Sequence, residues 1–334
     1  MVITQLLSQG AHRIEDMPLQ FIDLFAGIGG FRLGLEAHGD QCVFSSEWDI
    51  DSQATYEMNF GVVPFGDITK IKETTIPDHD VLCGGFPCQA FSVSGKQRGF
   101  EDSRGTLFYD ILRIAREKNP KVIFLENVRN LIKHDSGNTM EVIRRSLTDL
   151  GYNVFFKTLR SSDFGVPQAR QRVYIVAFRQ DLGISKFDFP KPTDSITVVK
   201  DVLERGVDSS GYEIRRPDIS LYGDESAITD PRKPHQIGII NKGGQGERIY
   251  SVNASGITLS AYGGGAASKT GAFLVNGKVR KLTPRECARL QGFPESFIPH
   301  PKARLAYKQF GDSVSVPVIQ AIYGQIRLTL EGLS

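Results

Sequence analysis

The sequence predicts an α/β fold with a largely parallel sheet, joined to a smaller region that is mostly β or irregular. Short apolar runs alternate with segments of helical spacing over the first half of the chain. The alternation stops after Phe189, where Pro190 and Pro192 open a region of short β-like runs, turns and glycines. Helical spacing then returns near the C-terminus, so we expect the last part of the chain to rejoin the first domain.

Each expected element has its own signal. Short apolar runs predict the strands, and these runs cover residues 19–25, 42–48, 80–86, 121–127 and 172–178. Helical spacing predicts the helices at residues 29–39, 106–120, 138–151, 283–292 and 315–332. Gly39 and Gly151 suit the ends of helices, and Pro284 suits a first helical turn.

A chain of 334 residues exceeds what one compact core usually holds, so two domains are expected. We place a catalytic and cofactor-binding domain at residues 1–200 plus 310–334. A target-recognition domain is expected at 201–285, with a hinge at 286–309.

Charge is unevenly distributed although the formal net charge is only +2. Residues 181–230 hold 11 acidic and 6 basic side chains, whereas residues 232–294 hold 10 basic and 2 acidic ones. The basic stretch is also glycine-rich, which favours backbone and arginine contacts to a polyanion. A solvated basic face is the alternative.

Cysteine and histidine usage argues against disulfides and metals. The four cysteines form no C-x-x-C pair, and the six histidines have no metal-ligand spacing, so we expect no metal. The first twenty residues lack the apolar stretch of a signal peptide. No segment approaches the roughly 18 apolar residues of a membrane span. We therefore expect a cytoplasmic protein without a membrane partner.

The turn "DLFAGIGG", residues 23–30, lies between an expected strand and an expected helix. Its glycines, Gly27, Gly29 and Gly30, would let a ligand approach the backbone, although a tight turn explains them about as well. Glu47 follows the second strand, where an acidic side chain can accept from ribose hydroxyls. Trp48 could stack on adenine, and Asp67 could accept from an exocyclic amine. The G-x-G-x-x-G pattern is missing, so S-adenosylmethionine fits better than a nicotinamide cofactor.

Cys88, in "GGFPCQAFS", stands in a glycine-rich turn where a core-filling cysteine has little to fill. A thiol is a strong nucleophile, but with a pKa near ~8.5 it needs help from its surroundings. Glu126 ends a strand expected beside the one that leads to Cys88, and Arg170 and Arg172 precede another strand. Packing by Cys88 and helix capping by Glu126 are the alternatives.

One reaction uses a thiol, a carboxyl group, an arginine and a methyl donor together. Carbon 5 of cytosine is a poor nucleophile, but addition of a thiolate to carbon 6 turns the ring into an enamine that attacks a methyl sulfonium. A carboxyl group at ring N3 makes that addition easier. A base then removes the hydrogen at carbon 5 and the thiol leaves.

These residues resemble the DNA cytosine-C5 methyltransferase family along nearly the whole chain. The segments "DLFAGIGG", "GGFPCQAFS", "ENV", "QARQR", "RKLTPRECARLQGFP" and "YKQFGDSVSVP" occur in the family's order. The resemblance is nearest to the HhaI-type, GCGC-specific modification methyltransferases. It implies a Rossmann-like S-adenosylmethionine-dependent methyltransferase fold, with S-adenosylhomocysteine as product and no metal.

The resemblance also implies roles for individual residues. Cys88 would be the nucleophile, Glu126 would contact the cytosine N3 and amino group, and Arg170 and Arg172 would help hold the base and the phosphates. The cofactor-binding residues would be Phe25, Gly27, Gly29, Gly30, Glu47, Trp48, Asp67, Ile68, Pro87, Leu107 and Asp312. The family usually has asparagine at position 312, so Asp312 bears on cofactor affinity.

The family's target base must leave the duplex, which costs a few kcal/mol. By resemblance, Gln245 and Ser94 would fill the gap that it leaves, and Arg248 would read guanine. Thr258 and Tyr262 match the same recognition region, so the implied target is GCGC with its first internal cytosine methylated. Duplex DNA is the expected partner of a monomer, and a cognate restriction endonuclease is a partner that the family suggests.

Three alternatives remain from other function classes. A tRNA cytosine methyltransferase could use the same scaffold, and a catalytically silent relative could bind nucleic acid only. The presence of Cys88, Glu126 and Arg172 argues against the silent relative, and the basic, glycine-rich region favours duplex DNA over tRNA. A nicotinamide oxidoreductase is further away, because its glycine pattern is missing.

Overall fold

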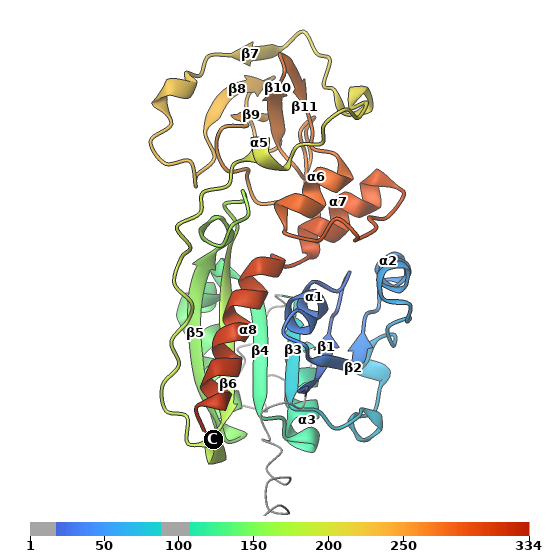
Figure 1. Cartoon of the computed structure of the whole chain (residues 1–334), viewed down its shortest axis with the longest axis vertical. Coiled ribbons are helices and arrows are strands. Elements are labelled where there is room, and N and C mark those ends of the chain that lie inside the picture. The colour runs from blue at the N-terminus through green and yellow to red at the C-terminus, as the bar shows by residue number, and fades with distance from the viewer. Residues whose placement is uncertain (1–17, 88–106, 334) are drawn as a thin grey trace, which may run out of the picture.

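A computed structural model describes residues 18–87 and 107–333 of the chain. The described residues form two sheets, one below the other in Figure 1, with helices around the lower one. The lower, catalytic sheet is built from β1 (Gln20–Leu24), β2 (Gln41–Ser46), β3 (Val81–Gly85), β4 (Val122–Val128), β5 (Tyr152–Arg160) and β6 (Gln171–Arg179). Its helices are α1 (Gly30–Glu36), α2 (Ile50–Phe60), α3 (Leu107–Lys118), α4 (Asn138–Asp149) and α8 (Val316–Glu331).

The catalytic sheet is mixed, with the strand order β2-β1-β3-β4-β6-β5. The first four strands of that order are parallel, and β6 runs antiparallel to both β4 and β5. The predicted strands and helices of the first half are all present. In this half, two of the helices and strands named above were not predicted from the sequence, namely α2 and β5.

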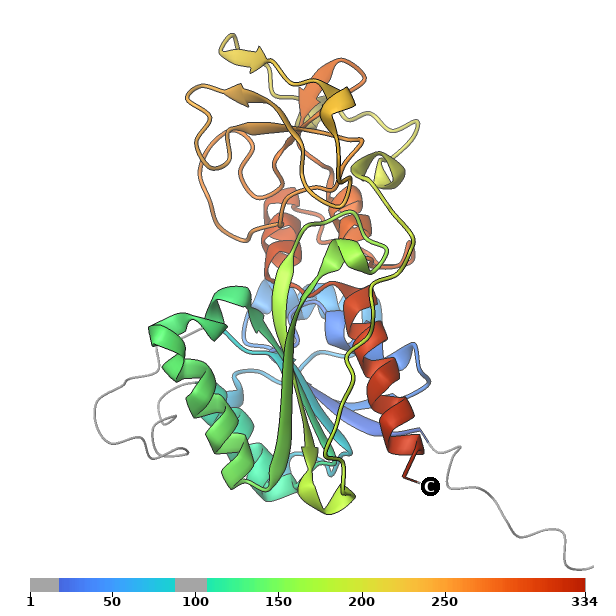
Figure 2. The same ribbon diagram turned by 90° about the vertical axis from the view of Figure 1, so that its left-hand side faces the viewer.

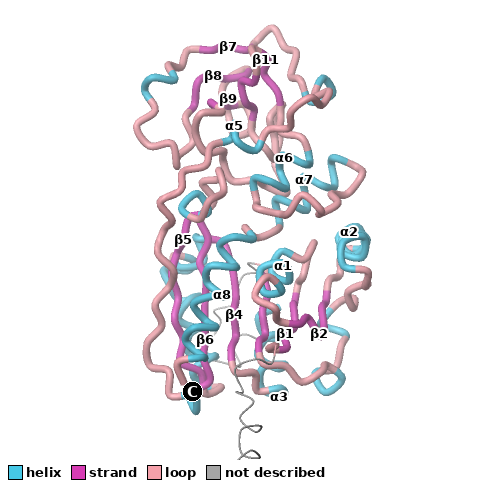
Figure 3. Tube along the Cα trace, viewed as in Figure 1, coloured by secondary structure: helices cyan, strands magenta, loops and turns pink. Residues whose placement is uncertain are grey.

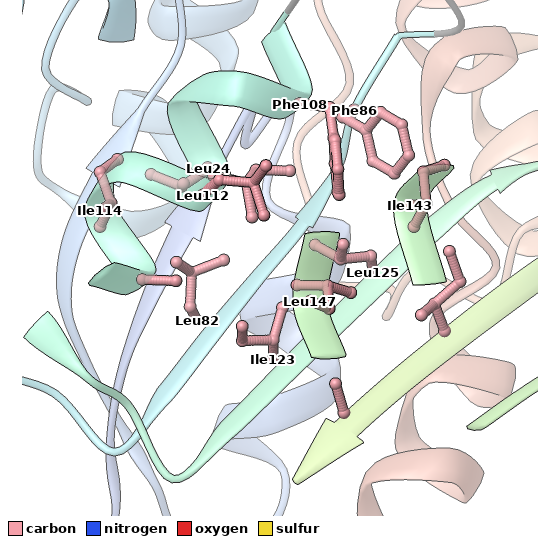
Figure 4. Packing of buried hydrophobic residues seen from close by; sticks show 14 of the residues in the cluster. Leu24, Leu82, Phe86, Phe108, Leu112, Ile114, Ile123, Leu125, Ile143 and Leu147 are labelled. Carbon is pink, nitrogen blue, oxygen red and sulfur yellow. The ribbon is translucent and has the colours of Figure 1, made fainter. Parts of the chain in front are cut away.

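Helices cover both faces of the catalytic sheet (Figure 2). On one face, buried side chains of α3 and α4 pack against alternate residues of the strands. Figure 4 shows this layer, which includes Leu24, Leu82, Phe86, Phe108, Leu112, Ile123, Leu125, Ile143 and Leu147. On the other face, α1 and α8 pack together, so the C-terminal helix does rejoin the first domain.

The second, recognition sheet has five short strands in the order β11-β10-β9-β8-β7. They are β7 (Ile219–Leu221), β8 (Gln236–Ile240), β9 (Arg248–Ser251), β10 (Ala272–Val275) and β11 (Lys278–Arg280). Loops make up most of this part, as Figure 3 shows. The sheet falls within the predicted range 201–285, and the limits proposed for the domains stay a prediction.

Three short helices lie between the two sheets: α5 (Val199–Val202), α6 (Pro284–Leu290) and α7 (Ala303–Asp312). A single buried cluster joins them to both parts, since it contains Ile28 near β1, Phe273 of β10, Leu290 of α6 and Phe310 of α7. Thr283 caps α6 with a reciprocal hydrogen-bond pair to Glu286, and Pro284 stands in the first turn, as predicted. The recognition sheet therefore shares a core with the catalytic domain.

Candidate active site

A cavity of about 620 Å³ opens at the edge of the catalytic sheet that faces the recognition sheet. The carboxyl ends of β1 to β4 and the first residues of β6 contribute to it. Ligands of open α/β sheets bind at this edge. Most of the residues predicted for the site line it, namely Phe25, Gly27, Glu47, Trp48, Asp67, Ile68, Pro87, Leu107, Glu126, Arg170, Arg172, Tyr262 and Asp312.

Glu47 is the most constrained acidic group of the cavity. It is buried, and its two carboxylate oxygens accept hydrogen bonds from the backbone N–H groups of Gly27 and Asp49, each at 2.8 Å. Burial raises the pKa of Glu47, and the backbone amides of Asp49 and Gly27 oppose that rise. Gly27 and Phe25 hold this turn at positive φ, 56° and 55°, which glycine adopts without strain and phenylalanine does not. The turn and the carboxylate thus fix each other.

Apolar and acidic groups suited to a nucleoside also line the cavity. Ile68 is buried, while the Trp48 side chain is 75% exposed beside the cavity, so Trp48 is not a core residue. Asp67 accepts from the Thr69 backbone N–H at 3.1 Å and its hydroxyl at 2.8 Å, and these bonds hold the pKa of Asp67 below its usual range. Glu47, which the turn holds in place, and Asp67 supply two acceptors, and Trp48 supplies an exposed ring. These three groups fit the ribose and adenine of S-adenosylmethionine.

Glu126 lies on β4 rather than at a helix start, so it caps no helix. It is buried, and its Oε1 lies 3.0 Å from Nε of Arg172 on the neighbouring β6. The next residue, Asn127, donates from Nδ2 to the Phe86 carbonyl at 2.8 Å. That bond anchors the chain just before Pro87, the last residue described before Cys88. Cys88 and Ser94 themselves lie outside the described residues.

Arg170 and Arg172 differ in their surroundings although only Gln171 separates them. Arg170 is buried, and its guanidinium donates to the carbonyls of Leu259 (3.3 Å), Gly311 (3.2 Å) and Ser313 (2.7 Å). Burial lowers the pKa of Arg170 to about 10. Arg170 therefore connects the loop of Leu259 with the segment of Gly311 and Ser313 that precedes α8. Arg172 instead faces Glu126.

Asp312 stands at the cavity wall at the end of α7. Lys308 pairs with it at 3.5 Å and with Asp49 at 2.6 Å, so one ammonium lies between two carboxylates. Burial raises the pKa of Asp312, and Lys308 opposes this rise. The lysine that accompanies this acidic position was not predicted, although its spacing of four residues from Asp312 on a helix is the usual signal for an ion pair.

Two predicted cofactor glycines, Gly29 and Gly30, do not line the cavity. A Cβ on Gly29 would lie 2.2 Å from the Phe60 ring, and one on Gly30 would lie 2.7 Å from Cγ2 of Val314. Close packing thus explains both glycines, and their contact with a cofactor stays a prediction.

The predicted recognition residues lie on two loops and a strand of the recognition sheet. Gln245 and Arg248 are exposed, Thr258 is half-buried, and Tyr262, 75% exposed, reaches the cavity. The two glycine-rich loops touch, since a Cβ on Gly246 would lie 2.2 Å from the Gly264 carbonyl oxygen. The loop of Gln245 is therefore packed directly on the loop that carries Tyr262.

The remaining cysteines have packing roles. Cys83 and Cys287 are buried, and burial raises the pKa of both thiols well above the usual value. Across residues 18–87 and 107–333, no three histidine, cysteine or acidic side chains gather where they could hold a metal ion. The same ranges contain no helix that is both long and apolar enough to cross a membrane.

Comparison with known proteins points in one direction. The sequence pattern of the family described as C-5 cytosine-specific DNA methylase matches residues 19–328. The chain is 57% identical over 304 residues to the type II methyltransferase M.HhaI of Haemophilus parahaemolyticus, covering 91% of this chain and 93% of that protein. It is 44% identical to M.SsoII of Shigella sonnei, covering 95% and 82%. The fold matches that of the S. pombe Dnmt2 methyltransferase with a TM-score of 0.70 at 22% identity, covering 95% and 99%.

Proposed function

Because the chain belongs to the C-5 cytosine-specific DNA methylase family and is a DNA cytosine methyltransferase of the type II restriction-modification kind, we propose that it methylates the first internal cytosine of GCGC and uses Cys88 as its nucleophile. The observation that carries the mechanism is the Glu126–Arg172 pair. It lies in the wall of the same cavity as Glu47 and Trp48, next to the turn that leads into Cys88.

S-adenosylmethionine, when bound, supplies an electrophilic methyl group and leaves as S-adenosylhomocysteine. Glu47, Asp67 and Trp48 would hold its adenosine part. Asp312 and Lys308 line the same cavity and would meet its amino-acid part.

The remaining steps belong to the protein and the cytosine. The Cys88 thiolate adds to carbon 6, while Glu126 holds ring N3 and the amino group, and Arg172 places its positive charge 3.0 Å from Oε1 of Glu126. Carbon 5 then forms its bond to the methyl group, a base removes the hydrogen from carbon 5, and the thiol leaves. Each of these steps needs the base out of the duplex. Gln245 and Ser94 would occupy the gap, and Arg248, Thr258 and Tyr262 would read and hold the flanking bases.

The proposal is tested by incubating the full chain with labelled S-adenosylmethionine and plasmid DNA, followed by digestion with an endonuclease that cuts GCGC. Protection of every GCGC site is expected. Protection at another sequence would refute the target, and labelling of tRNA alone would refute the substrate. We also propose that the protein acts as a monomer alongside a cognate restriction endonuclease, which sizing of the free protein and of its DNA complex checks in part.

The role of Cys88 has a separate test. Cys88→Ala should abolish methyl transfer while DNA binding persists. A duplex with 5-fluorocytosine at the target should form a stable adduct with the unmodified protein, because the hydrogen that must leave is replaced by fluorine. Methyl transfer by the alanine variant would overturn the mechanism.

A further inference from the structure

A second cavity, of about 890 Å³, lies at the β5 edge of the catalytic sheet. Its walls come from β5, from the turn Arg129–Ile132 that follows β4, and from the segment that includes Pro190 and Pro192. Figure 1 shows that segment running beside β5 toward the recognition sheet. We call this the flank cavity, and its charged and amide-bearing side chains include Arg129, Lys133, Lys157, Arg160, Asp163 and Gln171.

The flank cavity is positively charged. Four basic side chains line it and one acidic side chain, Asp163, which Arg160 already engages at 2.7 Å. Lys133 and Lys157 are exposed, and neither has an ion pair within the described part of the chain. Uncompensated cations in a concave surface concentrate positive potential and attract polyanions. The proposed active site uses neither lysine.

The flank cavity and the active site are lined by residues that are neighbours in sequence. Arg129 donates to Oε1 of Gln171 at 2.6 Å, and Gln171 precedes Arg172, which faces Glu126. Arg129 also follows Glu126 by three residues, a span of at most about 10 Å. An anionic chain that leaves the active site at this side therefore meets Arg129 first.

We propose that the flank cavity binds the phosphate backbone of duplex DNA beyond the recognition sequence, on one side of the target base. This inference rests on the proposed function. A site of four base pairs spans only about 14 Å at 3.4 Å per base pair. Lys133 lies roughly 8 Å beyond Arg129 at about 2 Å per residue of a 3₁₀ turn. The cavity thus lies within about five base pairs of the target.

The test compares the double variant Lys133→Ala/Lys157→Ala with the control Lys72→Ala/Lys186→Ala. The control removes two exposed lysines that line neither cavity, so the change in net charge is equal. Affinity for three duplexes is measured by fluorescence anisotropy at several salt concentrations. One duplex ends close to GCGC, and the other two extend it on one side or the other. Methyl transfer is measured on the same duplexes.

The unmodified protein should bind one extended duplex more tightly than the short one, and the Lys133/Lys157 variant should lose that gain. Two lost phosphate contacts lower the salt slope by about 1.8, so between 50 and 200 mM salt the unmodified protein loses about 12-fold more affinity than the variant. The control should behave as the unmodified protein. Thermal melting, and a second variant with glutamine at both positions, verify that folding is intact.

Two results would overturn the inference. One is a Lys133/Lys157 variant that keeps both the length-dependent gain in affinity and the full salt slope. That result would indicate that the cavity binds an acidic protein partner instead of DNA. The other is an unmodified protein that gains nothing from either extension. The short duplex separates these failures from a failure of the proposed function, because all variants should methylate it equally. An absence of methylation there would count against the function instead.

Discussion

The two arginines of "QARQR" should fail in different ways when they are replaced. Arg170→Met removes three hydrogen bonds from a buried guanidinium and leaves the carbonyls of Leu259, Gly311 and Ser313 without that donor. Breaking a buried charged network of this kind costs about 3–5 kcal/mol. With an unfolding entropy near 2.1 cal/mol/K per residue, a chain of this size loses about 4–7 °C in melting temperature.

Arg172→Met is the matched control, because it removes the same group two residues away. Arg172 donates one hydrogen bond, to the Gln171 carbonyl at 2.9 Å, and pairs with Glu126 at the cavity. We expect it to melt within about 2 °C of the unmodified protein. Its methyl transfer should fall by about 100-fold or more, as when a group that stabilises developing charge is removed.

Circular dichroism melting and a methyl-transfer assay on the same preparations check both variants. The reasoning is refuted if Arg170→Met melts like the unmodified protein. It is equally refuted if Arg172→Met loses as much stability as Arg170→Met. Burial of Arg170 and the position of Arg172 at the cavity would then not explain a difference between the two side chains.

Three further predictions concern single residues. Glu47→Gln should raise the KM for S-adenosylmethionine about 10- to 100-fold, or about 1.4–2.8 kcal/mol, since a neutral amide replaces the carboxylate acceptor; kinetics at saturating DNA would show it, and an unchanged KM would contradict it. Burial raises the pKa of Asp23 to about 8, so the folded state keeps a proton that the unfolded state releases above its ordinary value of 3.8. Stability should therefore fall as pH rises from about 4 to about 8, and urea unfolding of Asp23→Asn should lack this decline. Gly34→Ala should cost about 1–3 kcal/mol, because its Cβ would lie 2.4 Å from Cγ2 of Ile319 and push α1 from α8; an unchanged urea midpoint would contradict that contact.

The strands and helices that the sequence predicts share one property, which is a strong apolar pattern. β1, β3 and β4 are almost wholly buried, and α3 and α4 carry one apolar face each. Such patterns are direct consequences of burial, so they are visible without tertiary information.

The two elements of the first half that were missed, α2 and β5, lack this property. α2 buries only Ser52, Thr55 and Tyr56, so it shows little periodic apolar signal. β5 is an edge strand whose residues are mostly half-buried or exposed, and it pairs with β6 alone. The pattern of its side chains resembles that of a loop. β6 runs antiparallel because β5 stands between α4 and β6 in the chain, so the direction of β6 could not be predicted without β5.

The residues of the candidate site also divide into those that the sequence could place and those that it could not. Glu47 follows a strand and Glu126 lies near the end of one, so the common carboxyl edge of the sheet brings them together without any further information. Asp67 instead follows α2 and precedes a short 3₁₀ helix. Lys308 belongs to a helix far along the chain, and no local pattern places it beside Asp49. The same limit explains why Arg170 and Arg172 could not be distinguished, because burial by a distant loop is a tertiary property.

That distant loop is hydrogen-bonded to the segment that leads into β6. The Gln168 side chain accepts from the Leu259 backbone N–H at 3.0 Å and donates to the Leu290 carbonyl at 3.2 Å. The Ala169 backbone N–H donates to the Gly256 carbonyl at 2.9 Å. These bonds fix the recognition loop to the segment that continues into β6 and carries Arg172. Because these hydrogen bonds lie close together and are largely buried, we expect a displacement of that loop to move Arg172 as well.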